Sequence, residues 1–359
     1  MGIFIALLIL SLLIFFHELG HFVVARAVGV KVEAFSIGFG KKIISKKLGD
    51  TVWAVSIIPL GGYVKMKGQD DTNPLAKSQD RDSYNSKKPW QRIIILLAGP
   101  FANFLVAFLL YFSASQMGTY LSPLFDYSHY LNPIIGEFSK ESPAKNAGLK
   151  EGDRVLEING IEVKRWDNLK DIIESQEGVL NFKIQRGNRV LEFKIEPTIK
   201  KLKNKFGEVI ERRVVGIAPQ IPKDNLEFSP IEGIKFAYHE TVYASTLIFQ
   251  SIQKLLTGAV PTKELGGVIT IVDITAKASQ SGILILLFLT ALISVNLGVL
   301  NLLPIPALDG GHIMFNLYEL ITRKPPNEDI MYKLTIMGWI ILLSLMALGI
   351  YNDLNKILG

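Results

Sequence analysis

The sequence of 359 residues contains no cysteine. The chain can therefore form neither a disulfide bond nor a thiolate metal site, which leaves histidine and the carboxylates as its only strong metal ligands. Histidine is itself scarce, with five residues in the whole chain. The net charge of +6 is modest, and the basic residues are dispersed among acidic ones without interleaved aromatic residues. This pattern argues against a nucleic acid partner.

Apolar residues are abundant, at 49% of the chain. They gather in four stretches that approach or exceed the length of about 20 residues that a helix needs to cross a bilayer, namely residues 2–28, 93–115, 283–303 and 334–350. No basic segment precedes the first stretch, so we expect it to be a permanent anchor. The fold class expected is an α-helical polytopic membrane protein with four transmembrane helices and the lipid bilayer as a partner.

Charge predicts the orientation of these helices. Residues 29–91 are rich in lysine, and basic loops are retained in the cytoplasm. Counting spans forward then places residues 116–282 outside, the loop at Arg323 and Lys324 inside, and the C-terminus outside.

A polar motif, His17-Glu18-x-x-His21, interrupts the first apolar stretch. Residues four apart share one face of a helix, so His17 and His21 can bind one metal ion while Glu18 flanks a water molecule on it. Ionisable groups are costly in lipid unless they have partners, which makes these residues functional candidates. A proton relay uses the same residue types and is the main alternative.

A hydrolytic zinc ion takes three protein ligands and keeps one position for water. The third apolar stretch ends in Asn301-x-x-Pro-x-Pro-x-Leu-Asp309-Gly-Gly-His312, where two prolines stop a helix and two glycines free the backbone. We expect Asp309 to be the third ligand, and an N-cap of a following helix is the alternative. For His312 we expect a structural or supporting role. His129 and His239 have no partners at ligand spacing and are predicted to be ordinary polar residues.

The two motifs together resemble those of the site-2 protease family, and the resemblance runs along essentially the whole chain. It is nearest to the bacterial branch that cleaves membrane-anchored anti-sigma factors. The resemblance implies that His17, His21 and Asp309 bind Zn²⁺ and that Glu18 is the catalytic base. It also implies a multi-pass protein of the bacterial inner (cytoplasmic) membrane, with single-span transmembrane proteins as substrates.

In that family the asparagine before the two prolines is associated with holding the substrate or the developing oxyanion, which implies this role for Asn301. Asn296 could assist, although an amide that packs helices together is the alternative. The small residues of the segment 98–104 predict close packing of the second span.

Short apolar segments punctuated by glycine, at residues 35–40, 52–58 and 59–66, predict a small membrane-associated β-sheet in the cytoplasmic part of a first domain, residues 1–116. An open sheet edge can accept an unwound substrate as an added strand. We expect Gly61, Gly62 and Tyr63 to contact substrate in this way. A simple cytoplasmic cap is the alternative.

Residues 132–198 have the strand-rich pattern of a second domain. The segment 142–160 resembles a bacterial permuted PDZ domain, which implies an extracytoplasmic α+β domain that recruits extended segments or filters out bulky ectodomains. Residues 228–282 mix apolar and charged residues and predict an amphipathic helix on the membrane surface followed by a connector. A helix packed against the PDZ-like domain is the alternative. Residues 283–359 complete the chain with the third and fourth spans.

The preferred interpretation is an intramembrane zinc metalloendopeptidase for regulated proteolysis of single-span proteins, such as anti-sigma factors or signal-peptide remnants. A non-catalytic PDZ-bearing scaffold is one alternative, and the intact metal motif argues against it. A proton-coupled transporter is another, but it would be expected to have more spans and internal repeats. The sequence implies no particular oligomeric state.

Overall fold

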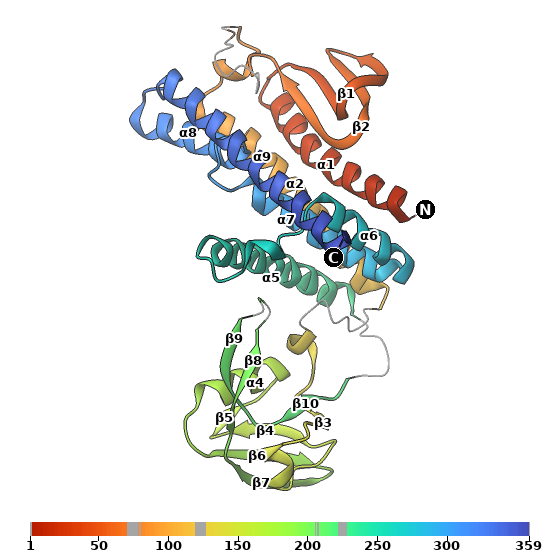
Figure 1. Ribbon diagram of the computed structural model, residues 1–359, viewed down its shortest axis with the longest axis vertical. Coiled ribbons are helices and arrows are strands. Elements are labelled where there is room, and N and C mark those ends of the chain that lie inside the picture. The colour runs from red at the N-terminus through yellow and green to blue at the C-terminus, as the bar shows by residue number, and fades with distance from the viewer. Residues whose placement is uncertain are drawn as a thin grey trace. The chain divides into compact units, whose positions relative to one another are not determined.

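The computed structural model describes residues 2–69, 78, 80–118, 127–204, 206, 208–221 and 228–358. The chain divides into two compact units (Figure 1). The first comprises Met1–Met117 and Phe228–Gly359, and the second is Gly118–Glu227. The second unit is wider at both ends than the predicted domain of residues 132–198.

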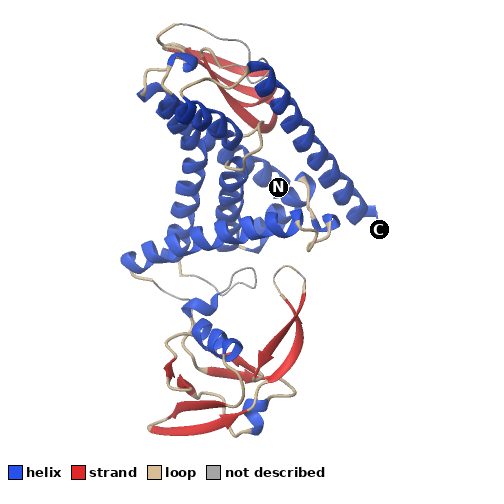
Figure 2. Cartoon of the chain, turned by 90° about the vertical axis from the view of Figure 1, so that its left-hand side faces the viewer, coloured by secondary structure: helices blue, strands red, loops and turns tan. Residues whose placement is uncertain are grey.

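The first unit is mainly helical (Figure 2). Its helices are α1 (Gly2–Ala27), α2 (Pro89–Gln116), α5 (Pro230–Leu256), α6 (Val268–Ser281), α7 (Ile283–Asn301), α8 (Asp309–Thr322) and α9 (Glu328–Leu358), with short 3₁₀ turns η1 (Tyr84–Ser86) and η3 (Thr262–Glu264). Among the described residues, the helices long and apolar enough to cross a membrane are α1, α2, α7 and α9. Each of the four predicted spans therefore coincides with one of these candidate membrane-spanning helices.

The last helix is longer than the apolar stretch 334–350 that predicted it. The helix continues through polar residues at both ends, and those near its C-terminal end have defined partners. The Asn352 amide donates hydrogen bonds to two carbonyls of the connection between α5 and α6, at 2.8 and 3.0 Å. The Asp353 carboxylate accepts from the backbone N–H groups of Gly267 and Thr270, at 2.9 and 3.1 Å. Asp353 therefore satisfies unpaired donors at the start of α6, and the far end of α9 is fixed to it.

Helices α1 and α2 pack with their backbones in close approach. A Cβ atom added at Gly20 of α1 would lie 2.2 Å from the Ala98 carbonyl oxygen of α2. Only glycine fits at such a distance, as is common where helices pack in membranes. The close packing expected of segment 98–104 is therefore present, and it brings the histidine face of α1 against α2.

Helix α5 does not qualify as a span, in agreement with its mixed composition. Its buried face packs on α2 and α7: an added Cβ at Gly233 would lie 2.4 Å from the Gln116 amide nitrogen, and the ring of Phe236 meets that of Phe288 edge-on at 6.1 Å. Exposed apolar residues such as Ile231 and Tyr238 occupy the opposite side. The helix thus belongs to the helical unit, and its second apolar face is exposed.

Strands β1 (Val32–Leu48) and β2 (Thr51–Met66) form the sheet of the first unit. Both strands bend, so the register contains three ladders. Residues 62–66 pair with 32–37, residues 34–37 pair on their other side with 52–55, and residues 51–56 pair with 42–48. The small sheet is therefore present, and no other described strand pairs with the outer side of 62–66.

Aromatic packing fixes this sheet to α1. Phe35 of β1 is buried and stacks on Trp53 at a ring distance of 4.6 Å. Phe15 and Phe22 of α1 meet the Phe35 ring edge-on at 5.5 and 5.8 Å. Aromatic contacts of this kind are stabilising beyond the area that they bury, so the sheet is held in a set position on the helix that carries the histidines.

The second unit contains η2 (Tyr127–Tyr130), helices α3 (Pro143–Asn146) and α4 (Trp166–Ser175), and strands β3 (Ile135–Phe138), β4 (Arg154–Ile158), β5 (Ile161–Glu162), β6 (Leu180–Arg186), β7 (Arg189–Ile195), β8 (Thr198–Lys203), β9 (Val209–Val214) and β10 (Ile217–Pro219). The main antiparallel sheet has the order β5-β4-β6-β7, and β8 pairs with β9. Strand β10 pairs with β3, and Val215 joins the core. This return pairing explains why the unit extends beyond residue 198.

An ion pair between a partly exposed arginine and a buried carboxylate joins the end of β6 to the residue before β4 in this unit. Arg186 donates from Nε and Nη2 to the two carboxylate oxygens of Asp153, both at 2.7 Å, and Asp153 also accepts from the Lys150 N–H at 2.8 Å. Burial acts to raise the pKa of Asp153, but the hydrogen bonds from Arg186 and Lys150 outweigh it and hold this pKa below its ordinary value. The ionised pair therefore stabilises the folded unit.

We expect Arg186→Met to destabilise the second unit by about 3 kcal/mol at neutral pH, because it leaves a buried carboxylate without its cation. A group with a lowered pKa stabilises the fold above its unfolded pKa and loses that contribution as the pH falls. The difference from wild type should therefore shrink below about pH 4. Amide hydrogen exchange of residues in this unit, measured in the full-length protein, tests both points.

Lys183→Met is the matched control, because Lys183 pairs with Glu157 at 2.9 Å on the exposed part of the same sheet. Exposed pairs contribute about 0 to 1 kcal/mol. Equal losses in the two variants would contradict the importance of the pair formed by Arg186 and Asp153.

Candidate metal centre

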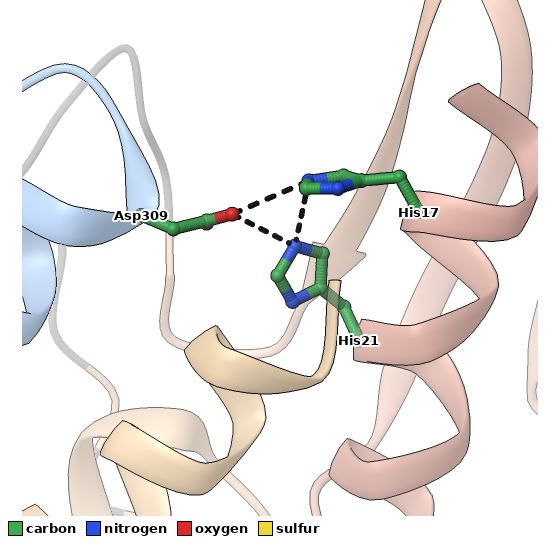
Figure 3. A group of neighbouring side chains, drawn as sticks. All are labelled: His17, His21 and Asp309. Carbon is green, nitrogen blue, oxygen red and sulfur yellow. Dashed lines mark hydrogen bonds and ion pairs between the residues drawn. The ribbon is translucent and has the colours of Figure 1, made fainter. Parts of the chain in front are cut away.

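Three side chains from two helices converge in the helical unit (Figure 3). His17 and His21 lie one turn apart on α1, and Asp309 is the first residue of α8. Asp309 Oδ2 lies 3.2 Å from His17 Nε2 and 3.4 Å from His21 Nε2, and the two Nε2 atoms are 3.2 Å apart. Both imidazoles are buried.

These separations fit a tetrahedral zinc ion. With zinc bonds of about 2.0–2.1 Å to nitrogen and oxygen, the ligand atoms of a tetrahedron lie about 3.3 Å from one another. The three observed edges of the triangle are 3.2, 3.2 and 3.4 Å. Two imidazole nitrogens and one carboxylate oxygen also form a donor set that zinc accepts. The fourth corner has no ligand in this set, as hydrolysis requires.

The protonation of His21 supports the same conclusion. Its Nδ1 lies 2.8 Å from the Ile95 carbonyl oxygen of α2, an acceptor, so Nδ1 carries a proton and donates it. In the neutral ring Nε2 is then an acceptor that faces a carboxylate oxygen, also an acceptor. Two acceptors at this distance repel each other unless a cation lies between them. A metal ion fits this requirement.

Space for an ion is kept open by Gly99 of α2. A Cβ atom at Gly99 would lie 2.3 Å from His21 Nε2 and 2.8 Å from His17 Cε1. Any side chain at this position would therefore fill the region on which the ligand atoms converge. Gly99 is one of the small residues that predicted helix packing alone, and the structure adds a second reason for its size.

The start of α8 places Asp309. An added Cβ at Gly310 would lie 2.3 Å from the Leu303 carbonyl oxygen, and one at Gly311 would lie 2.3 Å from that of Ile305. The two glycines therefore let the first turn of α8 pack directly on the broken segment that precedes it. The N-cap is Leu308, and Asp309 stands inside the helix. The alternative role of Asp309 as an N-cap is thus contradicted.

A salt bridge holds the rest of α8. Arg92 Nη2 lies 2.7 Å from Glu319 Oε1, and both side chains are mostly buried. This pair connects the N-terminal part of α2 to α8. Helix α2 thus contacts both elements that carry the ligands.

Glu18 lies beside the ligand cluster, between the two histidines in sequence, and is partly buried. A Cβ added at Gly62 of β2 would lie 3.5 Å from Glu18 Cγ and 3.3 Å from the Ile14 side chain. The outer ladder of the sheet therefore passes next to Glu18. The ring of Tyr63, the next residue, stacks with that of Phe39 at 6.4 Å, and Phe39 also covers Gly61.

The two asparagines of α7 lie on different faces. Ser294 Oγ donates to the Asn103 carbonyl oxygen of α2 at 2.8 Å, and an added Cβ at Gly298 would lie 3.1 Å from an aromatic ring of α2. These positions define the side of α7 that faces α2. Asn301 falls on the same side, and Asn296 falls on the opposite side.

Asn301 also stands at the level of the metal centre. The rings of Tyr111 on α2 and Phe288 on α7 are in contact at 5.7 Å. Asn103, earlier on α2, is hydrogen-bonded to Ser294, later on α7, so the two helices run antiparallel. Continuing that register along both helices brings Asn301 near the level of Gly99.

The remaining histidines stay outside the cluster of described metal-ligand candidates. His312 contacts the ring of Phe315 edge-on at 6.1 Å. His129 pairs with Asp167 at 2.8 Å, and His239 lies 3.2 Å from Glu240. All three have local polar or aromatic contacts, as expected.

Sequence reasoning missed two partners of the ligands on α2. The Ile95 carbonyl is a backbone group and leaves no mark in the sequence. Asn103 is fully buried, and its Nδ2 lies 3.1 Å from His17 Nδ1. The sequence showed Asn103 only as an amide within an apolar span, and helix packing would explain such an amide equally well.

Comparison with known proteins adds an independent finding. The chain is 45% identical over 352 residues to a protein of Campylobacter jejuni named "Putative zinc metalloprotease", covering 98% of this chain and 93% of the relative. It is 39% identical to one of the same name from Helicobacter pylori, covering 99% of each chain. A relative from Agrobacterium fabrum, also of that name, is 32% identical and covers 98% and 95%.

A solved PDZ domain of the SdrC-like protein from Listeria innocua matches 26% of this chain and 99% of its own length, with 25% identity and a TM-score of 0.20. That score is too low to establish a shared fold. The model of Peptidase family M50, by contrast, matches residues 5–345. The chain belongs to this family of metallopeptidases, whose cofactor is zinc, and is a multi-pass membrane metalloprotease.

Proposed function

We propose that this protein is an intramembrane zinc endopeptidase of the bacterial inner membrane that cleaves single-span membrane proteins, with anti-sigma factors or signal-peptide remnants as substrates. The observation that carries the proposal is the ligand triangle of His17, His21 and Asp309 on helices of a membrane unit. A peptidase centre on a spanning helix requires a substrate that enters the membrane.

The residues of the centre divide the work between them. His17, His21 and Asp309 would hold zinc, which polarises the scissile carbonyl and makes water acidic enough to attack near neutral pH. The Glu18 carboxylate takes the proton of the attacking water and delivers it to the leaving amine. Asn301, on the α2 side of α7 and near the level of Gly99, donates its amide N–H to the substrate carbonyl oxygen or to the oxyanion that develops there. Asn296 faces away from α2 and is proposed as a packing amide.

A transmembrane helix hides its carbonyls in hydrogen bonds, so a substrate must unwind before it is cut. The outer ladder of the sheet, residues 62–66, is suited to hold the unwound segment as an added strand. Its proximity to Glu18 supports this proposal, because a segment bound along Gly62 and Tyr63 would pass beside the base. Gly61 has no side chain that would collide with the ring of Phe39, so this ring can pack against the edge.

The second unit is proposed to be a PDZ-like filter on the extracytoplasmic side. The lysine-rich strand β1 favours a cytoplasmic sheet by the positive-inside rule, and counting spans then puts the second unit on the other side. His17 and His21 lie in the C-terminal part of α1, which leads into the lysine-rich sheet and would be nearer the cytoplasmic face. A domain on the other side can restrict the approach of bulky substrates more easily than it can position the bond to be cut.

Glu18→Gln should retain zinc, because all three ligands remain, but lose proteolysis by about 10²-fold or more, because the base is removed. Asp309→Ala, the matched variant, should lose both zinc and activity. Zinc content of the purified proteins and cleavage of a single-span substrate measure the two effects. Normal turnover by Glu18→Gln would exclude Glu18 as the base, and normal zinc content in Asp309→Ala would place the third ligand elsewhere.

The filter is tested by replacing residues 118–227 with a short Gly-Ser linker. The linker can be short because Gly233 near the start of α5 contacts Gln116 at the end of α2. Removing only residues 132–198 would leave β10 without its partner β3. We expect the deletion to accelerate cleavage of a substrate that still carries a folded ectodomain and to leave a trimmed substrate unaffected, because the metal centre lies in the other unit.

Initial cleavage rates on both substrate forms, in detergent and in vesicles, measure the effect of the deletion. A protein with the same linker inserted beside the intact unit controls for the linker itself. A loss confined to the trimmed substrate would indicate recruitment, and unchanged rates on both forms would rule out a filter.

A further inference from the structure

Helix α2 meets both histidines of the metal centre with one face. Ile95, Gly99 and Asn103 are spaced four residues apart and therefore lie in a row. The Ile95 carbonyl contacts His21 Nδ1, Gly99 makes room between the rings, and the Asn103 amide contacts His17 Nδ1. The two outer members of the row thus reach the ring nitrogens that point away from the ligand triangle.

These outer nitrogens decide whether the inner ones can bind a metal. A histidine that binds zinc through Nε2 carries its proton on Nδ1, and a hydrogen-bond acceptor there fixes the ring and its tautomer. For His21 the Ile95 carbonyl is this acceptor, at 2.8 Å. For His17 the group in the corresponding place is the Asn103 amide, whose Nδ2 lies 3.1 Å from Nδ1.

The Asn103 amide has an unused acceptor. Asn103 is fully buried, and its Oδ1 is a buried oxygen without a hydrogen-bond partner. An unpaired buried carbonyl of this kind costs about 1–3 kcal/mol. A half turn of the amide, which preserves its shape, would exchange Nδ2 and Oδ1 and direct the oxygen at His17 Nδ1. The proton on Nδ1 and the unpaired oxygen would then satisfy each other.

We propose that Asn103 is the positioning residue of His17: its Oδ1 accepts the Nδ1 proton when zinc is bound and so holds Nε2 toward the ion. The amide serves both states of the site. With Nδ2 toward the ring it pairs with a His17 that has its proton on Nε2, and with Oδ1 toward the ring it pairs with the zinc-binding tautomer. This inference rests on the proposed role of His17 as a zinc ligand.

The alternative is that Asn103 only packs α2 against α7, where its backbone carbonyl oxygen accepts a hydrogen bond from Ser294. Three substitutions separate the two roles. Asn103→Leu has a similar volume and no acceptor, Asn103→Asp keeps an acceptor at the same place, and Ser294→Ala removes the contact with α7 without touching His17.

The experiment measures how fast zinc leaves the full-length, zinc-loaded protein in the presence of excess chelator. We expect Asn103→Leu to release zinc about 10- to 100-fold faster than wild type, the usual effect of losing such a partner, and Asn103→Asp and Ser294→Ala to stay within about threefold. Thermal unfolding of the metal-free proteins checks that each variant folds. If Asn103→Leu does not fold, Asn103→Ala replaces it as the variant without an acceptor.

A second readout follows the rings directly. The chain has five histidines, so selective ¹⁵N-histidine labelling gives few signals. In the zinc-loaded protein the Nδ1 signal of His17 should move in Asn103→Leu while that of His21, which pairs with Ile95, stays in place. A purely structural change would move both signals or neither.

The outcomes separate the two proposals. A wild-type protein without stoichiometric zinc would contradict the metal role of His17 and this inference with it. Zinc-bound wild type together with wild-type release rates in Asn103→Leu would overturn this inference alone. Equally fast release from Asn103→Asp and Asn103→Leu would also overturn it, because an acceptor at this position would then not slow the release of zinc.

Discussion

The helical unit is organised around two imidazole nitrogens and one carboxylate oxygen that lie within 3.4 Å of one another and require a cation, either zinc or a proton, between them. Each neighbouring feature serves that requirement. Gly20 and Gly99 bring α1 and α2 close enough to share the site, and the two glycines after Asp309 let α8 begin directly on the broken segment. Without the ion the same arrangement would place a carboxylate against ring lone pairs at membrane depth, which is costly unless a proton compensates. Zinc binding and the packing of α1, α2 and α8 are therefore expected to stabilise each other.

Much of the helical unit could be predicted because its signals are local. Apolar length predicts the four spans, and the spacing of His17 and His21 predicts that they share a helix face. Elements set by distant contacts were not predicted. The start of α6 reads Val-Ile-Thr-Ile-Val, a run whose β-branched residues favour a strand, yet it is helical, with its first N–H groups bound by Asp353 from the end of the chain. The second unit extends past residue 198 because β10 returns to β3, a pairing between segments about 80 residues apart.

The candidate site shows the same division. The residue type alone shows which side chains can bind a metal, so two histidines and an aspartate could be singled out from the sequence. The groups that orient them could not. A backbone carbonyl such as that of Ile95 is the same in every residue, and Asn103 differs from a packing amide only in what lies opposite it. The faces of α7 likewise became known only from its contacts with α2, which separate Asn301 from Asn296.

The aromatic attachment of the sheet to α1 has a consequence for where a substrate can be cut. Because Phe35 and Trp53 fix the sheet relative to Glu18, a substrate strand that adds to the outer ladder as proposed would be held at a fixed position relative to Glu18. Side chains alternate between the two faces of a strand, so a segment added to this edge can shift only in steps of two residues if it keeps the same face toward the enzyme. Alternative cleavage positions within one substrate would then be separated by even numbers of residues. Which of the two strand faces a residue occupies would matter more for cleavage than the type of residue at the cut.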